Sequence, residues 1–246
     1  MLHSFYFTII NKKCIIIKGD HMKKLTQYIK NNLFAILMIV LIFVVQAFMY
    51  WATKFINEPM YKYDLSILGI DDKIPFINWF IIVYIGCYPW WYLGILAPLR
   101  YNRPKFYQYI VVSLISYLIA GLFFVFLPTE IERPVIENTN ILNWLVNFIY
   151  SSDTPTNLFP SMHCFISWNV YVCVRRDKNV PVAIRLGYLI MAILVCMSTV
   201  FIKQHFFVDI FAGILLCEVV NLIVGKTKIY LKLMKKEGKK DDYQSI

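Results

Sequence analysis

The chain has 246 residues, of which 59% are hydrophobic and 16% are charged, and its formal net charge is +10. Soluble globular domains are about 45–50% apolar and about 25% charged, so this composition excludes an ordinary soluble domain and indicates a protein that crosses a membrane several times. The basic residues flank apolar segments and form no patch with interleaved aromatic residues, which argues against a nucleic-acid partner.

The N-terminal segment, residues 1–21, is predicted to be an extension outside the folded part. Its apolar residues are too few to span a membrane and are interrupted by Asn11, Lys12 and Lys13. Residues 18–22 can be encoded by a ribosome-binding sequence followed by a start codon. We therefore expect translation to begin at Met22, and residues 1–21 to be a misassigned or disordered segment.

The rest of the chain is dominated by apolar segments of membrane-spanning length. A helix needs about 20 such residues to cross a bilayer, and the fourth segment is shorter than this. We expect an all-α polytopic bundle of about six transmembrane helices within residues 22–225, followed by a basic tail over residues 226–246. The six predicted helices are 32–51, 75–97, 105–127, 161–174, 181–201 and 205–224.

Lysine and arginine residues are distributed unevenly along this pattern. With the N-terminus in the cytoplasm, most of them fall on the cytoplasmic side, which is the usual bias of membrane proteins. The basic residues of the folded part left outside are Lys54, Lys62, Lys73, Arg133 and Lys203. This orientation predicts a cell (plasma) membrane protein with both termini cytoplasmic and with the 128–160 connection facing outward. The Lys/Ile/Asn-rich composition is compatible with an AT-rich bacterial genome.

His205 and Asp209 lie four residues apart at the edge of an apolar segment, a spacing that places both side chains on one face of a helix. A carboxylate there can accept the imidazole N–H and leave the other ring nitrogen free to attack. Ionisable residues at membrane depth are usually functional. The pair is therefore predicted to be an oriented nucleophile.

A second group of candidate residues begins the fourth apolar segment. Pro160 suits the first position of a helix, which places Ser161 in the first turn, where backbone N–H groups favour an anion. His163 is close enough to supply a proton. Arg133 offers a fork for phosphate oxygens, and Lys203 adds a mobile point charge. Together these parts predict phosphoryl transfer through a phosphohistidine.

These motifs resemble those of the type 2 phosphatidic acid phosphatase superfamily of membrane lipid phosphatases and phosphotransferases. Its third motif, Ser-Arg-x5-His-x3-Asp, aligns from Ser198 to Asp209, and its second, Pro-Ser-x-His, aligns with residues 160–163. The first motif, Lys-x6-Arg-Pro, survives only as Arg133-Pro134. The resemblance covers roughly residues 75–225, and it implies a helical membrane fold and an enzyme with a histidine nucleophile.

The resemblance also implies a role for each residue. His205 would be the nucleophile and Asp209 would orient it, while His163 would protonate the leaving alcohol. The residues expected to hold phosphate oxygens are Arg133, Ser161 and Ser198, with Lys203 added by inference. No metal and no other cofactor is implied, and the six cysteines contain no CxxC pair and no zinc-like spacing.

Two positions depart from the family pattern. Phe126 stands where the first motif has lysine, and Thr199 stands where the third motif has arginine. The sequence around Lys203-Gln204-His205 resembles the branch that includes inositol-phosphorylceramide synthase-like proteins, which transfer a phospho-headgroup between lipids.

Three functions remain open on the sequence alone. A membrane lipid phosphatase acting on a lipid phosphate monoester or diphosphate is favoured. A lipid phosphotransferase that passes the group to a lipid alcohol comes second. A non-catalytic lipid transporter or scaffold comes third, because the intact histidines and aspartate argue against it.

Overall fold

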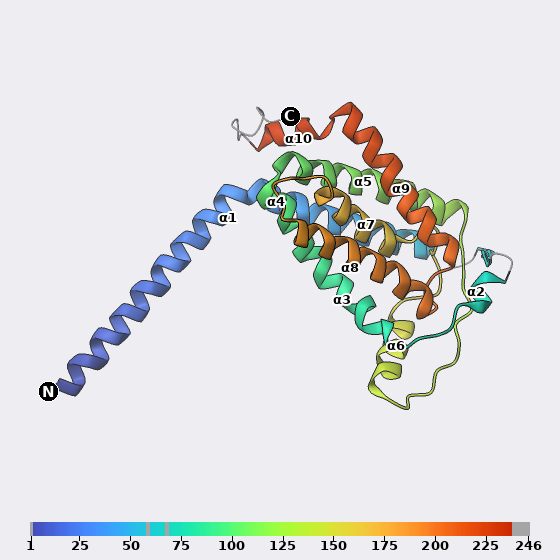
Figure 1. Ribbon diagram of the computed structural model, residues 1–246, viewed down its shortest axis with the longest axis horizontal. Coiled ribbons are helices and arrows are strands. Elements are labelled where there is room, and N and C mark those ends of the chain that lie inside the picture. The colour runs from blue at the N-terminus through green and yellow to red at the C-terminus, as the bar shows by residue number, and fades with distance from the viewer. Residues whose placement is uncertain (1, 58–59, 67–68, 238–246) are drawn as a thin grey trace. The chain divides into compact units, whose positions relative to one another are not determined.

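The computed structural model (Figure 1) describes residues 2–57, 60–66 and 69–237, with side chains described for Met22 and from Thr26 onward. The chain divides into two units, residues 1–41 and 42–246. The first unit holds the N-terminal part of helix α1 (Leu2–Asn57). The side chains of residues 1–21 and the end of the basic tail, residues 238–246, lie outside the described part, so the predicted start at Met22 stays a prediction.

The second unit is a helical bundle. Among the described residues there is no strand, only two isolated bridges that join Tyr63 to Thr129 and Glu130 to Thr156. Its helices after α1 are α2 (Ile70–Lys73), α3 (Phe80–Gly94), α4 (Leu96–Tyr101), α5 (Arg103–Phe126), α6 (Ile141–Ser152), α7 (Met162–Val174), α8 (Val182–Phe201), α9 (Phe207–Thr227) and α10 (Tyr230–Lys236). The predicted all-α fold is confirmed.

Five helical stretches of the described residues are long and apolar enough to cross a membrane: Thr26–Asn57, Phe80–Tyr101, Arg103–Phe126, Val182–Phe201 and Phe207–Thr227. Helix α7 takes the place of the predicted fourth span, but its 13 residues cover only about 20 Å, at about 1.5 Å per residue. The predicted membrane bundle is confirmed, with five long spans and this shorter apolar helix.

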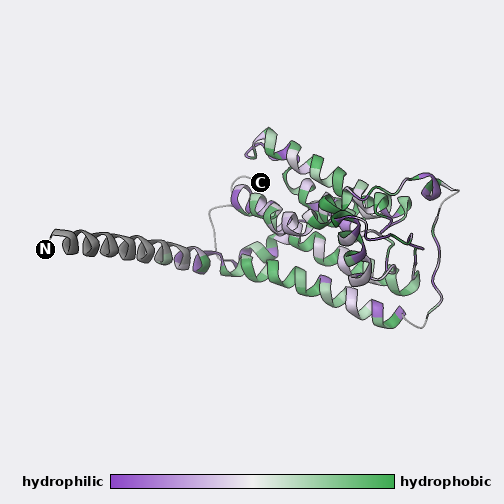
Figure 2. Cartoon of the chain, turned by 90° about the horizontal axis from the view of Figure 1, so that it is seen from below, coloured by the Kyte–Doolittle hydropathy of each residue, from purple (hydrophilic) through white to green (hydrophobic). Residues whose placement is uncertain are grey.

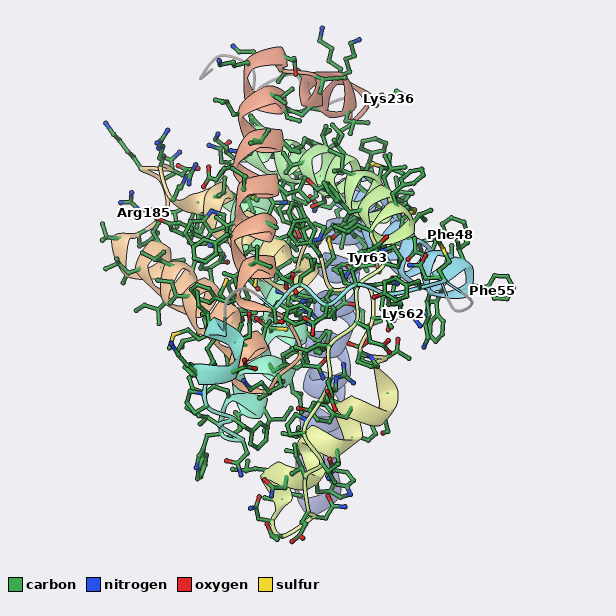
Figure 3. The ribbon with its side chains drawn as sticks, turned by 90° about the vertical axis from the view of Figure 1, so that its right-hand side faces the viewer. Phe48, Phe55, Lys62, Tyr63, Arg185 and Lys236 are labelled. Carbon is green, nitrogen blue, oxygen red and sulfur yellow. The ribbon has the colours of Figure 1, made fainter. Side chains whose placement is uncertain are left out.

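The outer faces of the long helices carry large apolar side chains, as lipid-facing surfaces do. Phe48 and Phe55 of α1 are 67% and 80% exposed, and Figure 3 shows Phe55 projecting away from the bundle. Apolar residues run along the helices, while hydrophilic residues gather at helix ends and in connections (Figure 2). The two ends of the bundle differ, because α2 and α6 lie at the end opposite to α4 and α10 (Figure 1).

Local signals in the sequence set where the central helices begin. The Asn102 side chain caps α5 by accepting from the N–H of Lys105 (3.1 Å), and Pro104 stands in the first turn. The Ser161 hydroxyl caps α7 by accepting from the N–H of Cys164 (3.4 Å). Ser161 is therefore the N-cap residue that precedes α7, and not a residue of its first turn as the sequence suggested.

Helices α7 and α9 approach each other very closely at their N-terminal ends. A Cβ atom added to Gly213 of α9 would lie 2.5 Å from the carbonyl oxygen of Ser161 and 3.3 Å from Cβ of Cys164. The Ser161 N–H donates to the Asp209 carbonyl oxygen at 3.2 Å. Only glycine at position 213 leaves room for this contact.

We expect Gly213→Ala to lower the free energy of unfolding by about 1–3 kcal/mol, because the added methyl group meets backbone atoms that cannot rotate away. The measurement is thermal unfolding of the purified protein in detergent. Gly187→Ala in α8 is the matched control: nothing lies within 4 Å of its added Cβ, so this change should be neutral or stabilise the helix by up to about 1 kcal/mol. Equal melting temperatures for the two variants would contradict the close approach.

Candidate active site

The turn between α8 and α9 carries the first pair of candidate residues. The His205 Nδ1 and Asp209 Oδ2 atoms lie 3.2 Å apart, although α9 begins at Phe207, two residues later than the sequence suggested. The same carboxylate oxygen accepts from the N–H of Phe206 at 3.0 Å. Asp209 therefore both caps the start of its own helix and orients the His205 ring. With Nδ1 engaged, Nε2 is the ring nitrogen left for chemistry.

Burial and charge act in opposite directions on His205, whose side chain is 7% exposed. Burial alone lowers the pKa of this imidazole, but the hydrogen bond and the negative charge of Asp209 outweigh it and raise the pKa above its ordinary value. The pair therefore stabilises the charged form of the ring, which is the form that a phosphorylated or protonated imidazole takes.

His163, in the first turn of α7, lies beside His205. The centroids of the two rings are 5.7 Å apart. Tyr84 stacks on the His163 ring at 4.6 Å, and the Tyr88 hydroxyl is hydrogen-bonded to its Nε2 atom at 3.2 Å. The two tyrosines come from α3, so this helix fixes the orientation of His163.

A cavity of about 440 Å³ opens beside the two histidines. Its apolar wall comes mainly from α1, α3 and α5, and includes Phe43, Trp51, Trp91, Tyr92, Ala120 and Phe124. Most of its polar wall comes from residues 152–163 and the 204–205 turn, and includes Asp153, Thr154, Thr156, Asn157, His163, Gln204 and His205. A molecule with an apolar body and one polar group matches this division.

Arg133 is close to this site but does not line the cavity. Its Nη1 atom donates to the carbonyl oxygens of Asp153 (2.7 Å) and Tyr150 (3.2 Å), and its Nη2 atom donates to Oε1 of Gln204. Its guanidinium lies 4.7 Å from the centre of the Tyr150 ring. Burial lowers the pKa of this guanidinium from its ordinary value, although the charge of Asp153 opposes the shift.

The structure does not bring Lys203 and Ser198 to the cavity. Lys203 has a positive φ of 52°, and its amine donates to the carbonyl oxygens of Asp71 (2.8 Å) and Ile74 (2.6 Å). The Ser198 hydroxyl donates to the carbonyl oxygen of Val195 (2.7 Å) and is fully buried. Lys203 thus ties the turn after α8 to the 71–74 segment, while the Ser198 hydroxyl is satisfied within α8.

Ser161 is joined to the site through its backbone. Its hydroxyl is fully buried and is occupied as the cap of α7, while its N–H bonds to Asp209 as described above. The residue links the helix that carries His163 to the helix that carries Asp209.

Two residues near this site, Asp153 and Asn157, were not predicted from the sequence. Asp153 lines the cavity and accepts a hydrogen bond from the Tyr50 hydroxyl of α1. Asn157, which has a positive φ of 60°, is held by Asn57 (2.8 Å) and Thr53 (3.1 Å) of the same helix. The polar residues Thr53 and Asn57 near the end of an otherwise apolar helix were the sequence feature that could have indicated these contacts.

Comparison with known proteins decides the family. The family model of the PAP2 superfamily matches residues 107–230, just over half of the chain. The chain belongs to the PAP2 superfamily. The matched region of this PAP2 protein includes every candidate residue named above except those of α1, α2 and α3. PAP2 proteins act as phosphatases or phosphotransferases on lipid-like substrates, in agreement with a two-sided cavity in a membrane bundle. No curated protein and no solved structure matched the chain.

Proposed function

We propose that the chain is an integral membrane lipid phosphatase that hydrolyses a lipid phosphate monoester or diphosphate through a phosphohistidine at His205. One observation carries the proposal: His205, held by Asp209, and His163 line the same cavity with ring centroids 5.7 Å apart. A nucleophile and a proton donor on either side of one phosphorus atom are the minimum for this chemistry.

The first step forms the bond between Nε2 of His205 and phosphorus, while the bond from phosphorus to the lipid oxygen breaks. His163 gives a proton to that oxygen, so a monoester leaves as the lipid alcohol and a diphosphate leaves as the lipid monophosphate. In the second step His163 takes a proton from water, whose oxygen attacks phosphorus. The N–P bond then breaks, which releases inorganic phosphate and restores His205.

Asp209 supports both steps by holding Nδ1 of His205 and stabilising the positive charge that the ring gains. The start of α7, which Ser161 caps, favours the phosphate because a helix N-terminus carries a partial positive charge. Lys203 contributes by tying the turn before His205 to the 71–74 segment.

Transfer of a phospho-headgroup to a lipid alcohol is the second candidate, and the charge of the cavity favours it. Among the described residues that line the cavity none is lysine or arginine, and one, Asp153, is acidic. A phosphodiester carries less negative charge than a terminal phosphate and needs fewer cations. Phosphate release measured with and without an added lipid alcohol separates hydrolysis from transfer.

His205→Ala should abolish turnover while the protein stays folded, because the covalent route loses its nucleophile and acid–base help alone contributes only about 10²–10⁴-fold. The measurement is phosphate release from lipid phosphates in detergent micelles, with the melting temperature as the control for folding. Activity within a few-fold of wild type would exclude the phosphohistidine mechanism.

His163→Ala should slow substrates with poor leaving groups far more than activated ones. A lipid alcohol needs the proton from His163, whereas p-nitrophenolate leaves without it, so the loss should approach about 10²–10⁴-fold only for the lipid phosphate. The measurement compares kcat/KM for a lipid phosphate and for p-nitrophenyl phosphate. Equal losses for the two substrates would deny His163 the role of the acid.

We further propose that the site faces outward in the cell membrane of a bacterium and that both termini are cytoplasmic. The lysine and arginine bias supports this, since Arg175 follows the C-terminal end of α7 and Lys226 lies in the last turn of α9, whereas His163 and His205 lie at the N-terminal ends of these helices. An impermeant thiol reagent should label a cysteine placed at Asn138 in intact cells. Labelling only after permeabilisation would reverse the orientation and make the substrate cytoplasmic.

A further inference from the structure

The charge of a phosphate must be balanced at this site, yet the described wall of the cavity offers no lysine and no arginine. The two cation positions of the family motifs hold Phe126 and Thr199. Lys203 is bonded to two backbone carbonyl oxygens. Arg133 is bonded to two carbonyl oxygens and to Gln204 and has a buried Nε that is unpartnered among the described residues, but neither it nor Lys203 lines the cavity. The phosphate therefore needs another hydrogen-bond donor.

Gln204 has the position and the free atom for this role. It directly precedes His205 and lines the same cavity, and its side chain is 2% exposed. Its backbone N–H and that of His205 both donate to the carbonyl oxygen of Thr199, at 2.8 and 3.1 Å, so the two residues are held on one turn. Within the described structure the Nε2 atom of Gln204 is buried and has no hydrogen-bond partner.

The contact with Arg133 determines which amide atom is free. A guanidinium carries only donors, so Gln204 must turn its oxygen toward Arg133, as it does. The NH₂ group is then the end of the side chain that has no partner within the described structure. A buried donor without a partner is unfavourable and uncommon in folded proteins, which makes a ligand acceptor the natural partner of this group.

We propose that Nε2 of Gln204 donates a hydrogen bond to a non-bridging oxygen of the phosphoryl group that is transferred to His205. Gln204 thereby takes the place of a cation that the family motifs supply. Arg133 is a positioning residue: it holds the amide by its oxygen and reaches the phosphate only through it. This assignment rests on the proposed function, since it needs a phosphoryl group at His205.

The direct test is binding of orthovanadate and of inorganic phosphate to purified wild type and to Gln204→Glu. Glutamate keeps an acceptor for Arg133 but has no N–H to give and adds a negative charge. We expect the Kd for either anion to rise by roughly 10- to 100-fold, the range for losing one hydrogen bond to a charged group. Wild-type affinity in a folded Gln204→Glu protein would overturn the assignment.

Gln108→Glu is the matched control. Gln108 is also buried, at 5% exposure, and its Oε1 atom also accepts from a cation, Lys105, at 3.0 Å. Its Nε2 atom is satisfied within the protein by Asn221 at 2.8 Å, and it does not line the cavity. This change should leave anion affinity within about 3-fold of wild type, well inside the effect of losing a charged hydrogen bond. An equal loss in both variants would make the effect a general result of burying a carboxylate and would overturn the assignment.

Should Gln204→Glu fail to fold, Gln204→Leu removes the donor without adding charge and is compared with Gln108→Leu. The Leu variant also tests Arg133. If Arg133 acts only through the amide, Arg133→Met should weaken vanadate binding in wild type but change it by less than about 3-fold in the Gln204→Leu background. Additive losses would place the guanidinium on the phosphate itself.

Anion binding is measured without turnover, so its outcome is separate from that of the proposed function. If turnover requires His205 but Gln204→Glu keeps wild-type anion affinity, the assignment of Gln204 is overturned and the proposed function stands. A wild-type protein that binds vanadate through Gln204 but hydrolyses and transfers no lipid phosphate would overturn the proposed function alone. A folded wild type that binds neither anion would overturn the assignment.

Discussion

The contact between the N-terminal ends of α7 and α9 is the constraint on which the site depends. His163 belongs to the first of these helices and Asp209 to the second. At the contact, atoms of α7 and its cap leave no room for a side chain at position 213 of α9. The Ser161 N–H and the Asp209 carbonyl oxygen then join the two starts directly. Because both helices begin here, their N-terminal ends bring partial positive charge to one place.

In the function that we propose, this arrangement lets a site with few cations favour an anion. Two helix N-termini and a neutral amide distribute the positive potential over fixed dipoles, which need no reorganisation when charge develops. In the same proposal Arg133 acts indirectly. Its guanidinium is hydrogen-bonded to a backbone carbonyl oxygen and to the side-chain oxygen of Gln204. A preorganised polar wall of this kind has most effect where water is excluded.

The order of the apolar segments and the two histidine motifs could be predicted from sequence, because helix periodicity and residue spacing are local properties. The positions of Ser161 and Lys203 could not. The Lys203 amine is bonded to backbone carbonyl oxygens of the distant 71–74 segment, and the Ser161 hydroxyl is occupied as the cap of α7. Gln204 and Asp153 could not be predicted either, because their hydrogen-bond partners, Arg133 and Tyr50, are far away in the chain.

The two walls of the cavity come from different parts of the chain. Most of the polar wall lies within the region that matches the PAP2 family, whereas much of the apolar wall comes from α1 and α3, which precede that region. Substitutions at residues such as Phe43 and Tyr92 can therefore change the apolar part of the cavity from outside the shared region. The same two helices also carry Tyr50, Tyr84 and Tyr88, which contact Asp153 and His163. Divergence of these helices would therefore act on both walls of the cavity together.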